Sequence, residues 1–193
     1  MESFEGVIKR VVNALNSTKI EYLLTGALAA SHYGLPRTTA DMDIIVKVSE
    51  ENLQSHLLPA LKTAGLKVEE EKISAVLKSG YHIITFEDSR SPFTVDVIFS
   101  RKTLKKRQSS VLGLPTFYQT PEDLILAKLR MIKATVPKVR ALKDVDDIKA
   151  VLRFSKVDLK AVRKGAQKNS TLPLLEKIIS ETETHDKQHS YVK

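Results

Sequence analysis

Two aspartates separated by a single residue, Asp41 and Asp43, begin an apolar run that continues to residue 48. On an extended segment the side chains at positions i and i+2 point to the same face, because strand side chains alternate with a period of two. Two carboxylates held side by side repel each other unless a cation lies between them. The spacing therefore predicts a Mg²⁺ site that substrate phosphates and water would complete.

A third carboxylate, Asp96, lies inside the strongly apolar run of residues 94–99. Burying an unpaired carboxylate is costly, so Asp96 either faces solvent at a sheet edge or has a partner. A metal ion shared with Asp41 and Asp43 would be such a partner.

The segment before the two aspartates has features of a phosphate-binding turn. An apolar run at residues 20–24 leads to Gly26, where the missing side chain allows a tight turn and close approach to a ligand. The small-residue stretch 27–33 then predicts a short helix, whose free backbone N–H groups could receive phosphate.

A lysine in an apolar helical stripe is the next candidate. Residues 120–123 read Thr-Pro-Glu-Asp, which predicts a helix start, and the stripe that follows places Lys128 on the buried face. Lys128 either extends harmlessly to the rim or projects into a cleft towards a phosphate. Asp144 and Asp147 share a face of the next helix, where they either orient Lys128 or substrate, or form a solvated acidic patch.

These residues must be positioned by a mixture of strands and helices, so we predict an α+β fold, a mixed sheet flanked by helices and followed by a C-terminal helical part. The catalytic core is expected at 1–102, the helical part at 103–182 and a flexible tail at 183–193. The spacing of apolar residues predicts which segments are helices and which are strands. The helices are expected at 4–15, 27–33, 49–65, 121–132, 143–154, 158–168 and 172–181, and the strands at 20–25, 41–48 and two to four times within 66–99, including an antiparallel pair at 81–86 and 93–99.

Charge is distributed unevenly along the 193 residues. Residues 1–100 carry 10 Lys and Arg against 13 Asp and Glu, net −3, while residues 101–193 carry 21 against 10, net +11. An acidic half followed by a basic half suits a protein that holds metal with one part and a polyanion with the other. Lys105, Lys106 and Arg107 are the expected polyanion contact, and an ordinary solvated basic surface is the alternative.

Several other kinds of protein and site are disfavoured by the sequence. The chain has no cysteine, no run long enough to cross a bilayer and no signal peptide, so we expect a soluble cytoplasmic protein without a membrane partner. The five histidines lack zinc-ligand spacing, and His32 on the small-residue helix is expected to be structural. Neither a nucleophile-elbow serine nor a glycine-rich dinucleotide motif is present.

Over about residues 20–155 the chain resembles the nucleotidyltransferase superfamily related to DNA polymerase beta, and most of all its abortive-infection and toxin-type branch in bacteria and archaea. The resemblance depends on the order and context of several short motifs rather than on the aspartate pair alone. These motifs are Gly26-Ala27 with its helix, Pro36-Arg37-Thr38-Thr39, Asp41-Met42-Asp43, the strand of Asp96, Pro121-Glu122-Asp123-Leu124 through Lys128-Leu129, and Lys143-Asp144 through Asp147-Ile148.

The resemblance implies a Mg²⁺-dependent transfer of a nucleotidyl group from a nucleoside triphosphate (NTP), such as ATP, to an acceptor hydroxyl. Asp41, Asp43 and Asp96 would be both the catalytic and the metal residues, holding two Mg²⁺ ions. The acceptor would be tRNA or a protein, and a toxin of this kind would have a cognate antitoxin as partner. The residues implied in nucleotide binding are Thr25, Gly26, Ala27, Arg37, Thr39, Lys128, Asp144 and Asp147.

One position departs from the family pattern. Gly-Gly or Gly-Ser is usual where this chain has Gly26-Ala27, so the phosphate grip lacks a hydroxyl or a second glycine. Thr25 or Thr39 could compensate. The alternative is a weakened or inactive member of the same fold that binds nucleotide or RNA. A nucleic-acid-binding module of another class is a poorer interpretation, because it has few aromatics for base stacking and leaves the three aspartates unexplained.

Overall fold

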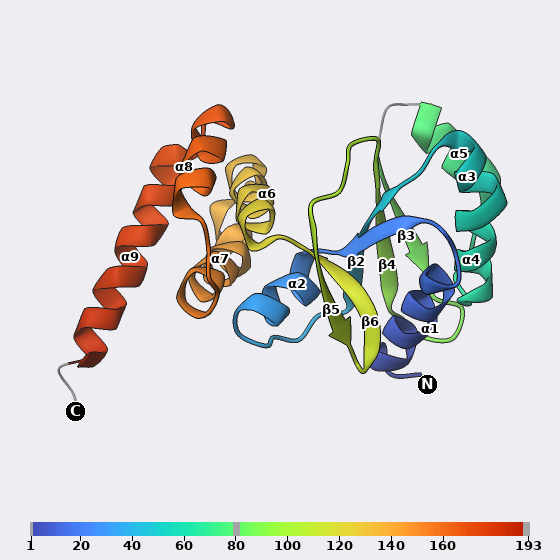
Figure 1. Cartoon of the computed structure of the whole chain (residues 1–193), viewed down its shortest axis with the longest axis horizontal. Helices are drawn as coiled ribbons and strands as arrows, with labels where there is room; N and C mark the ends of the chain where they lie inside the picture. Colours follow the sequence, from blue (N-terminus) through green and yellow to red (C-terminus); the bar gives the residue numbers. More distant parts are fainter. Residues whose placement is uncertain (1, 79–81, 191–193) are drawn as a thin grey trace. The chain divides into compact units, whose positions relative to one another are not determined.

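The computed structural model describes residues 2–78 and 82–190 (Figure 1). The chain divides into two compact units, which we call the sheet unit (Met1–Leu28 and Thr38–Gln119) and the helical unit (Ala29–Arg37 and Thr120–Lys193). Each unit is described by itself below. Tyr81, expected to start a strand, and the last three residues of the expected tail lie outside the described residues.

The sheet unit contains a six-stranded mixed sheet with the strand order β3-β4-β2-β1-β6-β5. The pairs β2·β4 and β1·β6 are parallel, and the other neighbouring pairs are antiparallel. The predicted α+β class and the predicted antiparallel pair β3·β4 are confirmed. The strands are β1 (Glu21–Leu24), β2 (Asp41–Lys47), β3 (Ile83–Glu87), β4 (Thr94–Ser100), β5 (Lys106–Val111) and β6 (Leu114–Gln119).

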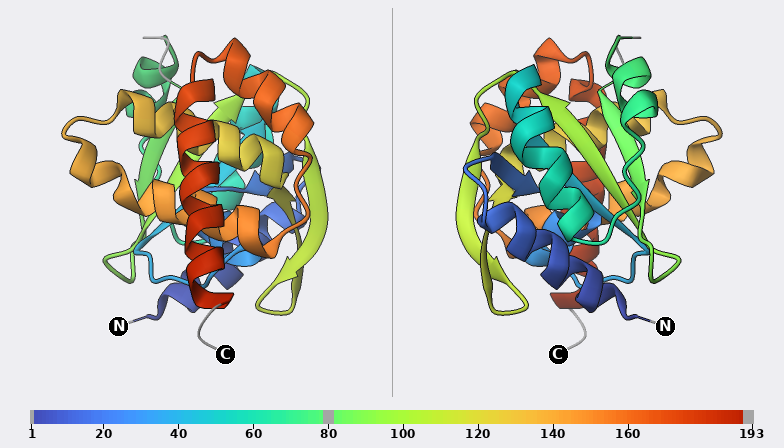
Figure 2. Two further views of the ribbon diagram at one scale, coloured as in Figure 1. Left: turned by 90° about the vertical axis from the view of Figure 1, so that its left-hand side faces the viewer. Right: turned by 90° about the vertical axis from the view of Figure 1, so that its right-hand side faces the viewer.

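One face of this sheet is the core of the unit. Met42, Ile44 and Val46 of β2 are fully buried, as are Val95 and Val97 of β4. Helices cover the core face (Figure 2, right), and they are α1 (Phe4–Asn16), α3 (Glu50–Asn52), the π-helical turn η1 (Leu53–Leu57), α4 (Leu58–Thr63) and α5 (Glu70–Lys78). Because strand side chains alternate, the residues between these apolar positions face the other side of the sheet.

Residues 66–99 contain a helix that the sequence does not predict. Two of the predicted two to four strands are present, β3 and β4, and before them come Leu66, which forms an isolated bridge with Asp88, and the helix α5. Glu70 and Glu71 lie in the first turn of α5, where carboxylates stabilise the helix N-terminus. Ile73 lies one helical turn further and is buried, so a helix buries the apolar position as well as a strand would.

Residues 106–119 also differ, because they form a hairpin of the sheet. The sequence predicts a helical part from residue 103, whereas the first helix after the core begins at Pro121. The two-residue turn consists of Leu112 at φ +50° and Gly113 at φ +82°. Both central residues of a type I′ turn need positive φ, and these two residues are usually Asn-Gly. Because leucine stands at the first of them here, the sequence does not indicate a hairpin turn.

The helical unit contains α6 (Pro121–Ala134), the 3₁₀ turn η2 (Lys138–Ala141), α7 (Leu142–Phe154), α8 (Leu159–Lys168) and α9 (Leu172–Ser190). Helix α2 (Gly26–Tyr33) begins in the sheet unit and ends in this one. The predicted start of α6 is confirmed, since the Thr120 hydroxyl accepts a hydrogen bond from the Asp123 backbone N–H at 3.3 Å.

The end of the helical unit differs from the expectation in one respect. The sequence predicts that the last helix ends near residue 181 and that a flexible tail begins at 183, but α9 continues to Ser190. Among the described residues no helix is both long enough and apolar enough to cross a membrane.

Candidate functional site

Strand register brings the three aspartates to one face of the sheet. Asp43 of β2 is the direct partner of Asp96 on the neighbouring parallel strand β4. Asp41 lies two residues before Asp43 and therefore on the same side. Asp41 is exposed, whereas Asp43 and Asp96 are half-buried, and all three lie on the face opposite the apolar core. The register of β2 and β4, which the sequence alone does not give, brings Asp43 beside Asp96.

Hydroxyl groups serve two of these carboxylates. The Thr85 hydroxyl on β3 donates to Asp96 Oδ1 at 2.6 Å, and the Thr39 hydroxyl donates to Asp41 Oδ1. Within residues 2–78 and 82–190, no three carboxylate or imidazole side chains converge closely enough, as they are oriented, to hold a metal ion. The donor chemistry nevertheless fits Mg²⁺, which prefers carboxylate oxygens supplemented by phosphate and water.

Gly26 is where the backbone comes closest to the row of carboxylates. Its φ is +58°, and a Cβ at this position would lie 1.9 Å from Asp43 Oδ2 and 2.5 Å from Asp43 Cγ. The Thr25 backbone N–H also donates to the Asp43 carbonyl at 3.0 Å. Any side chain at position 26 would therefore displace the Asp43 carboxylate, so the predicted need for glycine here has a direct structural cause.

Thr25 and Ala27, predicted as phosphate contacts, are buried. The Thr25 hydroxyl donates to Gln119 Oε1 at 2.5 Å, and Ala27 is 4 % exposed. Gln119 continues the polar row from Asp96 through Asp43 and Thr25, on the same face of the sheet. Sequence reasoning missed Gln119 and Thr85 as neighbours of the aspartates. The polar position at the end of an apolar run was the available signal for Gln119.

Four of the other predicted nucleotide contacts form an ion cluster inside the helical unit, and they are Arg37, Lys128, Asp144 and Asp147. Arg37 donates from Nε and Nη2 to the two Asp147 carboxylate oxygens at 2.9 and 3.1 Å. Lys128 Nζ lies 2.7 Å from Asp147 Oδ2 and 2.8 Å from Asp144 Oδ1. The side chains of Lys128 and Asp147 are 7 % and 5 % exposed.

This ion cluster argues against one of the alternatives that the sequence leaves open for Lys128. The ammonium does not extend to the rim, because it is buried and paired with both Asp144 and Asp147. Removing one partner from such a buried set leaves an uncompensated charge, which is strongly destabilising. The cluster therefore links α6, α7 and the segment after α2 within the helical unit.

The three consecutive basic residues do not form one surface. Lys105 precedes β5 and is exposed. Lys106 Nζ lies 3.3 Å from Glu21 Oε1 and 4.4 Å from the centre of the Phe117 ring. Arg107 points to the opposite face of the strand, because neighbouring strand residues alternate. Of the three, Lys105 offers the simplest test of a polyanion contact.

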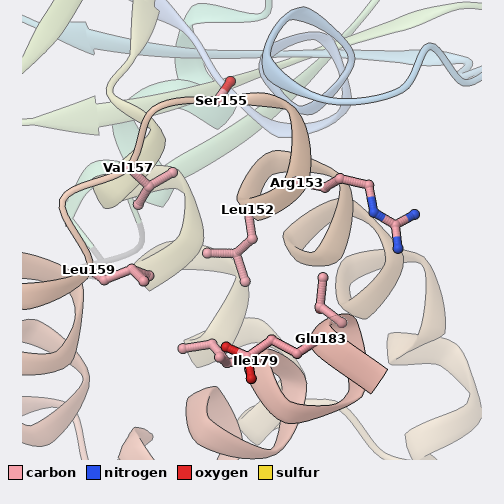
Figure 3. Close-up of a pocket in the computed structure, with 8 residues that line it drawn as sticks. Leu152, Arg153, Ser155, Val157, Leu159, Ile179 and Glu183 are labelled. Atoms are coloured by element: carbon pink, nitrogen blue, oxygen red, sulfur yellow. The ribbon is translucent and has the colours of Figure 1, made fainter. Parts of the chain in front are cut away.

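A pocket of about 300 Å³ lies in the helical unit (Figure 3). It contains none of the predicted site residues. The side chains that line it come from the end of α7, the segment before α8, and α9, and they are Leu152, Arg153, Ser155, Val157, Leu159, Ile179, Thr182 and Glu183. Ser155 is already engaged, since its hydroxyl donates to the Tyr33 carbonyl at 2.6 Å.

Solved structures identify the fold of the chain. An antigenic nucleotidyltransferase-like protein from Paracoccidioides brasiliensis matches with a TM-score of 0.59 and 16% identity, over 93% of this chain and 94% of that one. The chain has the nucleotidyltransferase fold. No protein-family model matches the sequence, and a search of curated proteins found no significant match.

Two antibiotic-modifying nucleotidyltransferases share this fold with the chain. ANT(2″)-Ia in complex with adenylyl-2″-tobramycin matches with a TM-score of 0.54 and 12% identity, over 92% of this chain and 97% of that one. The lincosamide antibiotic adenylyltransferase LnuA, bound to lincomycin, matches with a TM-score of 0.52 and 10% identity, over 78% and 99%. The predicted resemblance to the nucleotidyltransferase superfamily is thus confirmed as a likeness of fold.

Proposed function

We propose that this protein transfers a nucleoside monophosphate from an NTP to an acceptor hydroxyl, with release of pyrophosphate. The observation that carries the proposal is the register of β2 and β4, which pairs Asp43 with Asp96 on the face that also carries Asp41. The likeness of fold to proteins that hold adenylyl-tobramycin and lincomycin supports nucleotidyl transfer as the reaction class.

In this proposal Asp41, Asp43 and Asp96 hold two Mg²⁺ ions. Bound there, the ions would neutralise phosphate charge and align the attacking and leaving oxygens, which phosphoryl chemistry needs more than a covalent catalyst. Gly26 contributes by leaving room beside the Asp43 carboxylate. Thr39 lies next to Asp41 through its hydroxyl and is the best placed of the predicted phosphate contacts in the sheet unit.

The acceptor in this proposal is a polyanion such as tRNA, with a protein hydroxyl as the other choice. Net charge +11 over residues 101–193 favours a polyanion and disfavours a cationic acceptor. The resemblance to the toxin-type branch further supports a role as a toxin in the cytoplasm, held in check by a cognate antitoxin.

Labelled NTPs test the reaction. The purified protein is incubated with each α-labelled NTP, Mg²⁺ and a total cell extract, and label is then sought on RNA and on protein. We expect transfer by the wild-type protein and none by Asp43→Asn. If calorimetry finds no NTP binding even at millimolar concentration with Mg²⁺ present, the proposal fails.

Charge reversal at single lysines tests the acceptor. Lys105→Glu should weaken tRNA binding without changing NTP affinity, and wild-type binding should fall steeply with salt as counterion release requires. Lys106→Glu is a poorer variant, because it also breaks contacts with Glu21 and Phe117. Binding of tRNA that is flat between low and high salt would favour a protein acceptor.

A second candidate is a member of this fold that binds nucleotide or RNA without transferring it. Two observations favour it: Ala27 replaces the usual glycine or serine, and Asp144 and Asp147 neutralise Lys128. The two candidates differ in one measurement, because this one predicts NTP or RNA binding in the calorimeter with no label transferred from any NTP.

A further inference from the structure

Four exposed apolar side chains lie at the end of α6, in the connector that follows it and at the start of α7. Met131, Val136, Val139 and Leu142 are 60, 79, 66 and 56 % exposed. In the part of the chain that the structure describes, eight large apolar side chains are exposed, and half of them fall within the twelve residues 131–142. Single exposed apolar residues are normal, but several together indicate a surface that contacts something.

The charge around these residues is of one sign. From Leu124 to Lys143 the sequence contains six basic residues and no acidic one. Lys128 is buried in the ion cluster, whereas Arg130, Lys133 and Lys143 are exposed. We call the four apolar residues together with these three cations the connector surface. An exposed surface that is both apolar and basic complements a partner that is both apolar and acidic.

The backbone explains why these side chains are exposed. Thr135 ends α6 in an extended conformation, with φ −74° and ψ +131°, so the chain leaves the helix there. Between the end of α6 and the start of α7 the only helical element is the four-residue turn η2. In Figure 2 (left) the amber connector projects from the other helices of its own unit. Val136 and Val139 lie on this projecting segment and are exposed, whereas Ala141 at its end is buried.

We propose that the connector surface is a docking site for an acidic amphipathic segment of another protein. The apolar side chains would pack against the apolar face of that segment, and the three cations would pair with carboxylates along its margins. This proposal does not depend on the transfer reaction.

Three other occupants fit the connector surface less well. RNA recognition uses aromatic side chains to stack bases, and no aromatic residue occurs between Gln119 and Arg153. Helices that lie on membranes need a long continuous apolar face, which a four-residue turn does not provide. A second copy joined by two-fold symmetry would bring identical basic surfaces together, where like charges repel.

A peptide-display selection tests the proposal with the whole protein. A library of random 20-residue peptides is selected on the wild-type protein and depleted on the double variant Val136→Asp with Val139→Asp. We expect the enriched peptides to carry a net negative charge and apolar residues at helical spacing. Enrichment of neutral or basic peptides, or no enrichment over the depleted pool, would overturn the proposal.

The strongest selected peptide, fluorescently labelled, is then measured in solution. The double variant should bind it at least tenfold more weakly, and Lys143→Glu severalfold more weakly. Leu35→Asp is the matched control, because Leu35 is 55 % exposed in the same unit but lies outside the connector surface. All of these positions are exposed, so thermal unfolding should confirm that each variant folds. Equal binding by the double variant and the control would refute the site.

The other occupants are tested with the same variants. A labelled oligouridine 20-mer, vesicles containing phosphatidylglycerol and the oligomeric state by light scattering are measured for the wild-type protein and the double variant. We expect no difference between the two proteins in any of these measurements. If RNA, vesicles or self-association is lost in the double variant while peptide binding is not, the surface belongs to that occupant and the proposal is wrong.

Discussion

The two units treat their carboxylates differently. On the open face of the sheet, Asp41 and Asp96 accept hydrogen bonds from the hydroxyls of Thr39 and Thr85. In the helical unit, Asp144 and Asp147 lie against Lys128, and Asp147 also holds Arg37. A hydroxyl orients a carboxylate without cancelling its charge, whereas a lysine or arginine does cancel it.

This difference separates two roles that the sequence does not distinguish. A buried carboxylate paired with the protein's own cations is part of the fold, and removing it leaves those cations uncompensated. A carboxylate that accepts a hydrogen bond from a neutral hydroxyl, as Asp41 and Asp96 do, keeps its charge for a ligand. The predictions below ask whether loss of activity and loss of stability divide along this line.

The largest effect is expected at Asp43. Asp43→Asn should lower nucleotidyl transfer by more than about 100-fold, since even a neighbour of a metal ligand often contributes 10- to 100-fold. The free energy of unfolding should stay the same or rise slightly, because the change relieves repulsion between neighbouring carboxylates. Transfer is measured with labelled NTP and stability by urea unfolding. Unchanged turnover would remove Asp43 from the site.

The sequence predicts those features of the site that depend on residues close together in the chain, and not those that depend on residues far apart in it. Alternation within one strand is local, so Asp41 and Asp43 are correctly expected on one face. That Asp43 meets Asp96 depends on the register of strands more than fifty residues apart. The sequence offers a shared metal ion as one possible link between them but does not fix that register.

Side-chain pairing and turn chemistry account for most of the remaining differences. The sequence leaves Lys128 open between two roles because its partners, Asp144 and Asp147, belong to the following helix. Asp147 also pairs with Arg37, which lies 91 residues before Lys128 in the chain. The sequence gives no turn signal for the hairpin of β5 and β6, because Leu112 takes a positive φ that asparagine or glycine usually adopts. In each case a contact or strain that is visible only in the folded chain decides the structure.

The second prediction concerns Asp147, the carboxylate shared by both cations of the helical unit. Asp147→Asn should lower the free energy of unfolding by about 3 kcal/mol, as expected when one partner of a buried ion pair is removed. Asp146→Asn is the matched control, because Asp146 is the preceding residue of α7 and is exposed. Urea unfolding should separate the two variants clearly, and similar stabilities would show that the cluster is not structural.

The third prediction asks what Lys128 does. If its role is structural, Lys128→Met should cost about 2 kcal/mol of stability, because Asp144 and Asp147 lose a counter-ion, while the methionine preserves most of the apolar packing. The NTP dissociation constant of the folded variant should stay within about twofold of wild type. A tenfold rise in that constant with little loss of stability would make Lys128 a phosphate ligand. The ion cluster of the helical unit would then serve ligand binding rather than the fold.

Asp88 of the sheet unit is a buried carboxylate paired with a cation, and it tests whether the rule depends on pairing rather than on the unit. The Asp88 side chain is fully buried, and Arg10 Nη2 donates to its Oδ1 at 2.7 Å. The Ser91 hydroxyl donates to Oδ2 at 2.7 Å. Burial alone would raise the pKa of Asp88, but the hydrogen bonds from Ser91 and Arg10 outweigh it, so the pKa lies below its usual value.

The smallest effect is therefore expected at Asp88, and it should depend on pH. A depressed folded-state pKa stabilises the protein fully above the unfolded value of about 3.9 and loses that effect as pH falls through the folded value. Asp88→Asn should lose about 1 to 2 kcal/mol at pH 6.5, typical of hydrogen bonds to a charged group, and less at pH 3. Urea unfolding at the two pH values measures this. Glu176→Gln, which breaks the exposed pair with Arg163, should change nothing measurable at either pH. A loss at Asp88 that is equal at both pH values would mean that packing, rather than charge, holds this carboxylate in place.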